Sequence, residues 1–334
     1  MQLSHKLTHA LLALCALAFL SSAALAADPG LIYPSTSEIS DQKAGSILIY
    51  NIYTSSAATP NSQDTLISIT NTGSKGVFIH YFFVDGGSCS IADSFMCLTE
   101  NQKMSFLASD LDPGVTGYIV AVAVDGVTGC PVSQNSLIGS EYVKFTTGHH
   151  AELGAEAVSA LFTGTLPGCD ANSTTATLDF NSVVGLGYNR LPRVLAVDNI
   201  PSRTDGNDTL LIINRIGGNL GIGASKIGSL FGILYDDAEN SKSFTFSGDC
   251  QFRSSLSNNF PRTTPRFESV IPRGRSGWMK FYSQSDIGLL GAVINYNPSA
   301  TAGIGAFNGG VNLHKLTLSA SSSYLIPVFQ PSCG

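Results

Sequence analysis

Five arginines lie within 23 residues in the second half of the chain, and Glu268 is the only acidic residue among them. A guanidinium binds carboxylates and sulfates through paired hydrogen bonds and stacks on aromatic rings. With Trp278, which follows the last arginine, the cluster predicts a binding surface for an anionic glycan or an acidic protein face. The alternative is an ordinary solvated surface, because scattered charges are common on strands and loops. The arginine cluster consists of Arg253, Arg262, Arg266, Arg273 and Arg275.

Two short acidic stretches in the same half contain oxygen ligands of the kind that calcium prefers. One runs from Asp205 to Asp208 and the other from Asp236 to Asn240. Neither has the spacing of an EF-hand loop, and Asp, Asn and Gly are also the residues that turns favour. The interpretation as plain turns is therefore preferred, with calcium kept as the one cofactor that the sequence allows. The calcium candidates are Asp205, Asp208, Asp236, Asp237 and Glu239.

The histidines do not form a metal-binding or catalytic pattern. His149 and His150 are adjacent and so point in different directions, which predicts exposed turn residues. His80 lies inside an apolar run and is expected to be a hydrogen-bonded core residue, and His314 stands alone. No nucleophile elbow, zinc-protease motif or phosphate-binding loop occurs. Catalytic residues therefore cannot be assigned, and a protein without enzymatic activity is expected.

These candidates belong to a strand order that occurs twice. In each occurrence a strand that begins with Asp-Thr-Leu precedes an apolar run that ends in aspartate, and a Pro-Gly or Arg-Gly turn then leads to Gly-Tyr or Gly-Trp. Such recurrence indicates a duplicated domain. The first set comprises residues 64–71, 77–85 and 111–119, and the second comprises residues 208–214, 230–236 and 271–279.

These same segments, from Phe82-Phe-Val-Asp-Gly86 to Tyr118 and from Asp208 to Trp278, resemble a group of exported bacterial proteins that has no known activity. The resemblance covers nearly all of the mature chain. It implies export and a duplicated β-sandwich-like region. It transfers no catalytic or binding residue.

The first 26 residues have the layout of a secretory signal peptide. A polar start with Lys6 precedes an apolar run from Ala10 to Leu20, and Ala24-Leu25-Ala26 forms a small-residue cleavage site. Cleavage after Ala26 would deliver the protein to the periplasm or the extracellular space. No later segment is apolar over the length that a membrane-spanning helix needs.

Six cysteines follow the signal peptide, and an even number in an exported chain predicts three disulfides among 15 combinations. Close spacing favours Cys89 with Cys97 as a local staple. Cys250 with Cys333 would then tie the last strand to the second copy, and Cys130 with Cys169 would clamp the connection between copies.

Many short strands with Gly, Pro and Asn turns predict an all-β fold with two tandem antiparallel β-sandwiches of immunoglobulin-like type. The first domain spans residues 27–165, a linker spans 166–175, and the second domain spans 176–334. One helix is expected near the junction, at residues 151–161, because this segment is rich in Ala, Leu and Glu.

Charge is divided unevenly between these domains. Residues 27–165 contain four lysines, no arginine and 13 acidic residues, whereas residues 166–334 contain 13 basic and 11 acidic residues. The expected protein is a secreted or surface-displayed structural or adhesive one, whose oppositely charged domains meet either within one molecule or head to tail between molecules. The alternatives are a carbohydrate-binding module that uses Trp278 and Tyr118, and a secreted hydrolase with an unrecognised site. Nucleic acid is not an expected partner of an exported acidic chain.

Overall fold

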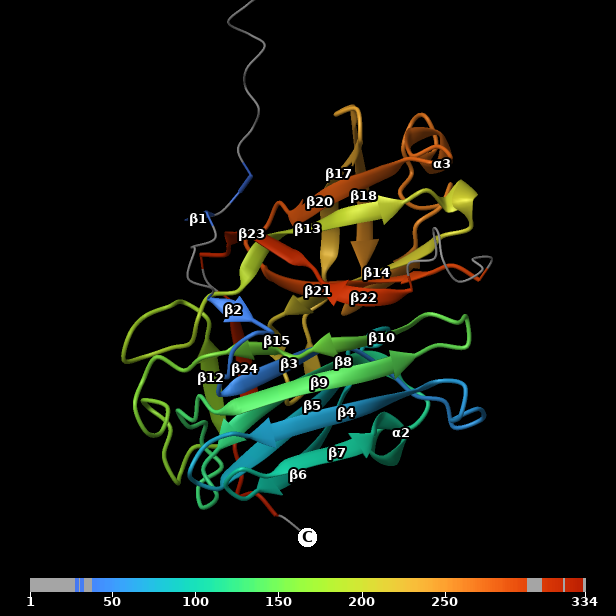
Figure 1. Ribbon diagram of the computed structural model, residues 1–334. Coiled ribbons are helices and arrows are strands. Elements are labelled where there is room, and N and C mark those ends of the chain that lie inside the picture. Colours follow the sequence, from blue (N-terminus) through green and yellow to red (C-terminus); the bar gives the residue numbers. More distant parts are fainter. Residues whose placement is uncertain (1–27, 30, 33–37, 299–307, 321, 333–334) are drawn as a thin grey trace, which may run out of the picture.

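The computed structural model describes residues 28–29, 31–32, 38–298, 308–320 and 322–332, and these residues form an all-β protein (Figure 1). Nearly all strand pairs are antiparallel, and the two α-helices in these ranges have four residues each. Over the same ranges, no helix is long and apolar enough to cross a membrane. The predicted signal peptide and Cys333 lie outside the described residues.

The first copy contains a six-stranded and a four-stranded sheet, which we call large sheet 1 and small sheet 1. Its elements are β2 (Ile39–Ser40), β3 (Ile47–Thr54), β4 (Asp64–Asn71), β5 (Val77–Asp85), β6 (Ile91–Leu98), β7 (Lys103–Leu107), α2 (Ala108–Leu111), β8 (Thr116–Val124), β9 (Leu137–Lys144), β10 (His150–Gly154) and β11 (Glu156–Val158). Large sheet 1 has the order β2-β11-β3-β8-β5-β6, and small sheet 1 has the order β10-β9-β4-β7.

The second copy also contains a six-stranded and a four-stranded sheet, large sheet 2 and small sheet 2. Its elements are β1 (Leu31–Ile32), β13 (Pro192–Pro201), η1 (Arg203–Asp205), β14 (Asp208–Ile216), β17 (Gly228–Asp236), β18 (Ser241–Gly248), β19 (Gln251–Ser255), α3 (Phe267–Val270), β20 (Ser276–Ser283), β21 (Gly288–Tyr296), β22 (Gly309–Asn312) and β23 (His314–Leu318). Large sheet 2 has the order β1-β23-β13-β20-β17-β18, and small sheet 2 has the order β19-β14-β21-β22.

The two copies have the same topology. The central strands β3, β8 and β5 of large sheet 1 correspond to β13, β20 and β17 of large sheet 2, and each small sheet follows the same correspondence. The repeated Gly-aromatic pair has one cause in both copies. A Cβ atom at Gly117 would overlap the carbonyl oxygen of Val84, and one at Gly277 would overlap that of Tyr235. Glycine therefore lets β8 and β20 approach the neighbouring strand.

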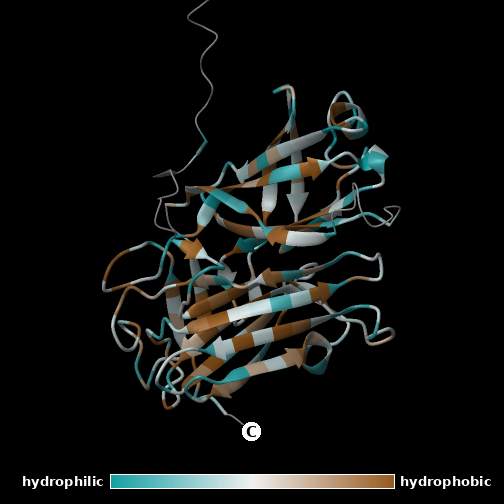
Figure 2. Cartoon of the chain, viewed as in Figure 1, coloured by the Kyte–Doolittle hydropathy of each residue, from teal (hydrophilic) through white to brown (hydrophobic). Residues whose placement is uncertain are grey.

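Within each copy the large and small sheets pack face to face. Tyr50, Ile67 and Phe83 belong to the cluster between the sheets of the first copy. Leu211 and Phe281 belong to the equivalent cluster of the second copy. Figure 2 shows apolar residues spread along these strands in both halves of the molecule. Burial of these side chains, at about 25 cal/mol per Å² of apolar surface, is the main stabilising contribution to each copy.

Small sheet 2 also packs against the first copy. Ile212 and Ile294 share a buried cluster with Ile52, Val143 and Leu153. Both faces of β14 and β21 are consequently buried, which explains why these strands are apolar almost throughout. The two copies thus share a continuous apolar interface.

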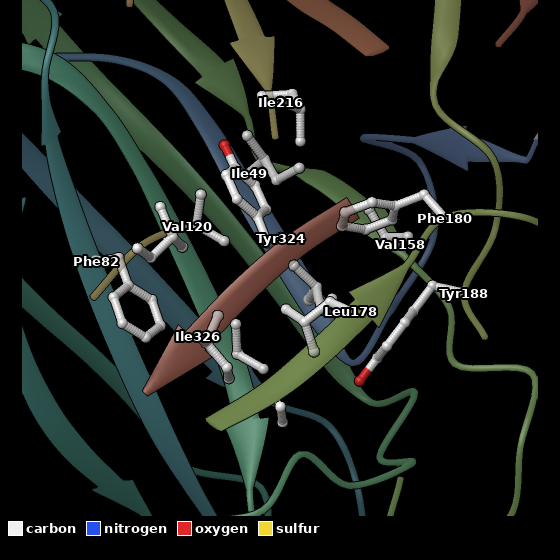
Figure 3. Packing of buried hydrophobic residues seen from close by; sticks show 14 of the residues in the cluster. Ile49, Phe82, Val120, Val158, Leu178, Phe180, Tyr188, Ile216, Tyr324 and Ile326 are labelled. Carbon is white, nitrogen blue, oxygen red and sulfur yellow. The ribbon is translucent and has the colours of Figure 1, made fainter. Parts of the chain in front are cut away.

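A fifth sheet among the described residues covers the outer face of large sheet 1, and we call it the cover sheet (Figure 3). It consists of β12 (Thr175–Asp179), β24 (Ser323–Pro327), β15 (Gly218–Asn219) and β16 (Gly223–Ala224). Leu178, Tyr324 and Ile326 pack on Phe82 and Val120. Residues from both sides of the expected linker at 166–175 therefore build one core.

The helix predicted for residues 151–161 is wrong, because this segment forms β10 and β11. Ala151 and Leu153 are buried while Glu152 is exposed, the alternation of a strand. Alanine suits this position because β10 lies close to small sheet 2, so tertiary packing overrides helix propensity. The two α-helices instead precede β8 and β20, at equivalent places in the two copies.

Two disulfides are formed among the described residues. Cys130 pairs with Cys169, as predicted. Cys89 pairs with Cys250, which contradicts the predicted Cys89–Cys97 and Cys250–Cys333 bonds. The physical reason is the packing of the β5–β6 turn against β19, where Gln251 donates its backbone N–H to the carbonyl of Gly86. Cys97 is also disulfide-bonded.

Candidate functional site

The outer face of large sheet 2 differs from the equivalent face of large sheet 1. In the first copy, the cross-strand pairs Val84–Tyr118 and Phe82–Val120 lie beneath the cover sheet. In the second copy, no sheet formed by the described residues covers the corresponding face (Figure 1). We call this surface the open face.

Three cross-strand pairs of β17 and β20 form the centre of the open face, and all six side chains are partly exposed. The rings of Tyr235 and Trp278 stack in parallel, with centroids 4.3 Å apart and planes 6° apart. At the other end of the row, the ring centroids of Phe231 and Tyr282 lie 5.6 Å apart. The pairs are Tyr235–Trp278, Ile233–Lys280 and Phe231–Tyr282.

The edge strand β18 adds a row of hydroxyl groups beside these rings. Ser241, Ser243 and Thr245 pair with Tyr235, Ile233 and Phe231 and therefore point to the same face. All three, together with Ser247, are exposed. The open face thus presents apolar rings and hydroxyl groups side by side.

A cavity of about 460 Å³ lies at the Phe231 end of the open face. Phe231 and Thr245 line it together with Ser229, Ser283 and Gln284, and the charged side chains in its lining, Arg215 and Lys226, are both cationic. The guanidinium of Arg215 donates to the carbonyl oxygen of Lys226 at 2.7 Å, and burial lowers the pKa of this guanidinium. The chemistry favoured here is binding of a polar or anionic group.

The charges around this cavity are only partly neutralised. Lys226 forms an exposed ion pair with Asp249 at 2.8 Å. Arg215 forms no ion pair with any residue in the described ranges. Arg215 also lines a second cavity of about 300 Å³, whose lining includes Asp179 and Asp286. The larger cavity is therefore the more cationic of the two.

The predicted arginine cluster is spread over separate contacts. The Arg253 guanidinium lies over the ring of Phe145 in the first copy, 5.8 Å from its centroid. Arg273 pairs with Asp205 at 3.3 Å, and Arg275 donates to Asp237 at 2.6 Å. All five arginines are exposed, and for Arg262 and Arg266 the described residues provide no side-chain ion pair. Trp278 lies on the open face.

The calcium candidates have local partners. Asp205 and Asp237 are paired with arginines, and Asp208 accepts from Arg203 at 2.8 Å. The pKa of Asp236 is lowered, mainly by a hydrogen bond from the side chain of Asn240. The backbone N–H groups of Asn240 and Ala238 donate further hydrogen bonds to the same carboxylate. Glu239 has a positive φ in the same turn. Among the described residues, no group of three or more acidic, His or Cys side chains is placed to hold a metal ion.

The histidine predictions have different outcomes. His80 is buried and hydrogen-bonded to Asp93 at 2.8 Å, as predicted. His149 was expected to be an exposed turn residue, but it is 2% exposed. Its ring nitrogens lie within hydrogen-bonding distance of the Thr147 hydroxyl and the Asp208 carbonyl of the second copy. The apolar interface between copies covers it, and burial lowers its pKa. His150 is half-buried and His314 is exposed.

Buried polar groups also link the two copies, and sequence reasoning did not find them. Lys315 Nζ of the second copy lies 2.7 Å from Glu156 Oε1 of the first. Asn214 and Gln251 of the second copy both donate to the backbone carbonyl of Asn51 in the first. The Asn51 side chain in turn donates to Asn312 at 2.8 Å. These contacts join residues far apart in the chain, so no local spacing marks them.

The open face could have been found from the duplication. Val84, Tyr118 and Val120 of the first copy correspond to Tyr235, Trp278 and Lys280 of the second. Lys280 stands where the first copy has the buried Val120, which indicates a face that is exposed to solvent. The Ser and Thr residues at alternate positions of β18 indicate the same exposure.

No protein-family model matches this chain, and comparisons with curated proteins and with solved structures likewise found no match.

Proposed function

We propose that this chain is an exported adhesive or structural protein that acts by binding, without catalysis, and that the open face is its binding surface. The observation that carries the proposal is the contrast between two equivalent faces. One is sealed by the cover sheet, whereas the other displays the partly exposed Tyr235–Trp278 stack. Aromatic side chains gather at recognition surfaces because they bury much area and lose little conformational entropy.

The connection between the copies supports a mechanical or scaffolding role. The Cys89–Cys250 disulfide, the Glu156–Lys315 ion pair and the shared apolar cluster all cross from one copy to the other. Such links make the copies move as one body and present the open face in a fixed orientation. Disulfides are compatible with an extracellular or periplasmic location. The finer fold assignment that we propose is a tandem of immunoglobulin-like sandwiches.

The contacts of the arginines argue against head-to-tail assembly through opposite charges. Arg273 and Arg275 are paired with Asp205 and Asp237 of their own copy. Their charge is therefore largely neutralised locally, and exposed pairs of this kind are screened by salt. The carbohydrate-binding alternative loses Tyr118, which is buried and hydrogen-bonded to Tyr324, but it keeps Trp278.

An array of bacterial envelope polysaccharides and extracellular proteins tests the proposed function. The purified chain is compared with Tyr235→Ala, which removes half of the aromatic stack. Tyr142→Ala is the matched control, because Tyr142 is exposed on small sheet 1. We expect at least one ligand that binds the native chain and Tyr142→Ala, is lost with Tyr235→Ala and is recovered chemically unchanged. Equal binding by all three proteins, or cleavage of the bound ligand, would refute the proposal.

A further inference from the structure

The arrangement of the open face and its cavity points to a class of ligand. We infer that the open face binds an acidic polysaccharide, with a sugar carboxylate in the Arg215 cavity and the neighbouring sugars along the row from Phe231 to Trp278. This inference rests on the proposed function, since it names the ligand of the same face. It places the acidic group outside the arginine cluster of residues 253–275.

Charge complementarity carries the first step. Arg215 and Lys226 are the charged side chains that line the larger cavity, and Arg215 has no carboxylate partner among the described residues. A partly buried guanidinium without a counterion favours an anion, and a carboxylate matches its geometry through two parallel hydrogen bonds. Ser229, Ser283 and Gln284 in the same lining offer further groups to sugar hydroxyls.

The shape and chemistry of the sheet carry the second step. The row from Phe231–Tyr282 through Ile233–Lys280 to Tyr235–Trp278 follows two adjacent strands and leads away from the cavity. Three successive pairs on one face of a sheet lie roughly 7 Å apart, since strand residues rise about 3.3 Å each. Aromatic rings contact the apolar faces of sugars, while the hydroxyl groups of β18 can bond to their edges. A linear chain of sugars fits this surface.

Lys280, at the centre of the row of cross-strand pairs, is already paired with a carboxylate. Lys280 Nζ lies 2.6 Å from Asp28 Oδ1, and Pro29 accepts a hydrogen bond from Thr317. The start of the described chain therefore lies beside the row without covering the rings of Phe231 or Tyr282, which remain partly exposed. Neutral or hydroxyl-rich parts of a ligand suit this central position, whereas the acidic group suits the cavity.

Titration of the full mature chain with alginate oligosaccharides tests this inference, with neutral cello-oligosaccharides as the comparison ligand. Trp278 is the only tryptophan, so its fluorescence reports directly on the open face, and calorimetry gives the affinity. Arg215→Met should weaken alginate binding about 10-fold to 100-fold, the cost of losing one or two charged hydrogen bonds. Lys226→Met, at an exposed position, gives a second reading if Arg215→Met folds poorly.

Arg262→Met is the matched control, because it removes an exposed arginine of the arginine cluster. Weaker alginate binding in both cavity variants, with Arg262→Met unchanged, supports the inference. Weaker binding in Arg262→Met alone overturns it in favour of the arginine cluster. Equal affinity for the neutral ligand also overturns it, but leaves the proposed function in place. If neither sugar binds and sedimentation shows a dimer that Tyr235→Ala dissociates, the occupant of the open face is a second copy.

Discussion

Lys315→Met is expected to destabilise the protein by about 3–5 kcal/mol, because it leaves a carboxylate buried without its partner. The Lys315 side chain is 13% exposed and that of Glu156 is 1% exposed, and their charged atoms lie 2.7 Å apart. Apart from this contact, neither carboxylate oxygen of Glu156 has a hydrogen-bond partner among the described residues. The lysine is therefore the main compensation for burying that charge.

This loss would be large relative to the whole molecule, since domains are typically stable by about 5–15 kcal/mol. Urea unfolding at pH 7, followed by circular dichroism, measures the change in the free energy of unfolding. The control is the double variant Glu156→Leu with Lys315→Met, which removes both charges and should recover most of the lost stability. The reasoning is refuted if the single variant lies within about 1 kcal/mol of the native chain, or if the double variant is as unstable as the single one.

The pH dependence of the same variant has a definite sign. Burial raises the pKa of Glu156, Lys315 lowers it, and Asp41 raises it. A raised folded pKa means that the folded state binds the proton more tightly than the unfolded state, in which a Glu titrates at about 4.3. The stability gained from this tighter proton binding is fully present below that value and is lost as pH rises through the folded pKa of Glu156. Lys315→Met removes the interaction that lowers this pKa, so the deficit relative to the native chain should be smaller at pH 4 than at pH 8.

Two further predictions concern links to the first copy. Replacing Cys89 and Cys250 by serine removes a cross-link between residues 161 positions apart and should cost about 5 kcal/mol by chain entropy. The same replacement of Cys130 and Cys169, which are 39 positions apart, should cost about 4 kcal/mol. Thermal unfolding of the two variants gives the order of the losses, and a larger loss for the Cys130–Cys169 variant would contradict this prediction. Tyr324→Phe removes a buried hydroxyl that lies 3.0 Å from the Tyr118 hydroxyl and should cost about 1 kcal/mol. Tyr118→Phe should cost more, because it also removes the donor to the Arg215 carbonyl; equal losses in urea unfolding would argue against this difference.

Local patterns in the sequence predicted much of the strand content. An apolar run such as Val77 to Val84 is typical of a strand covered on both faces, and β5 lies between small sheet 1 and the cover sheet. The helix predicted at residues 151–161 failed because alanine favours helices locally but also fits closely packed strands, and only the tertiary structure decides between them.

Long-range contacts set the limit of what the sequence could predict. Close spacing favoured Cys89 with Cys97, yet β19 brings Cys250 beside the turn after β5. The arginines between residues 253 and 275 are neighbours in the chain, but they contact Phe145, Asp205 and Asp237 at different places. No local pattern marks Arg215, which stands alone between Asn214 and Ile216, and its cavity exists only where β14, β17 and β20 meet.

The cover sheet has a consequence for the order of events during biosynthesis. β24, which contributes Tyr324 and Ile326 to the core of the first copy, is translated after every other strand described. Until residues 323–327 arrive, the cover sheet lacks the strand that lies between β12 and β15, so the outer face of large sheet 1, with Phe82 and Val120, is incompletely covered. The amino-terminal copy therefore cannot finish folding before the carboxy-terminal one has been made. Such a chain stays incompletely folded throughout synthesis, which exposes its apolar strands to aggregation until the last strand has been made.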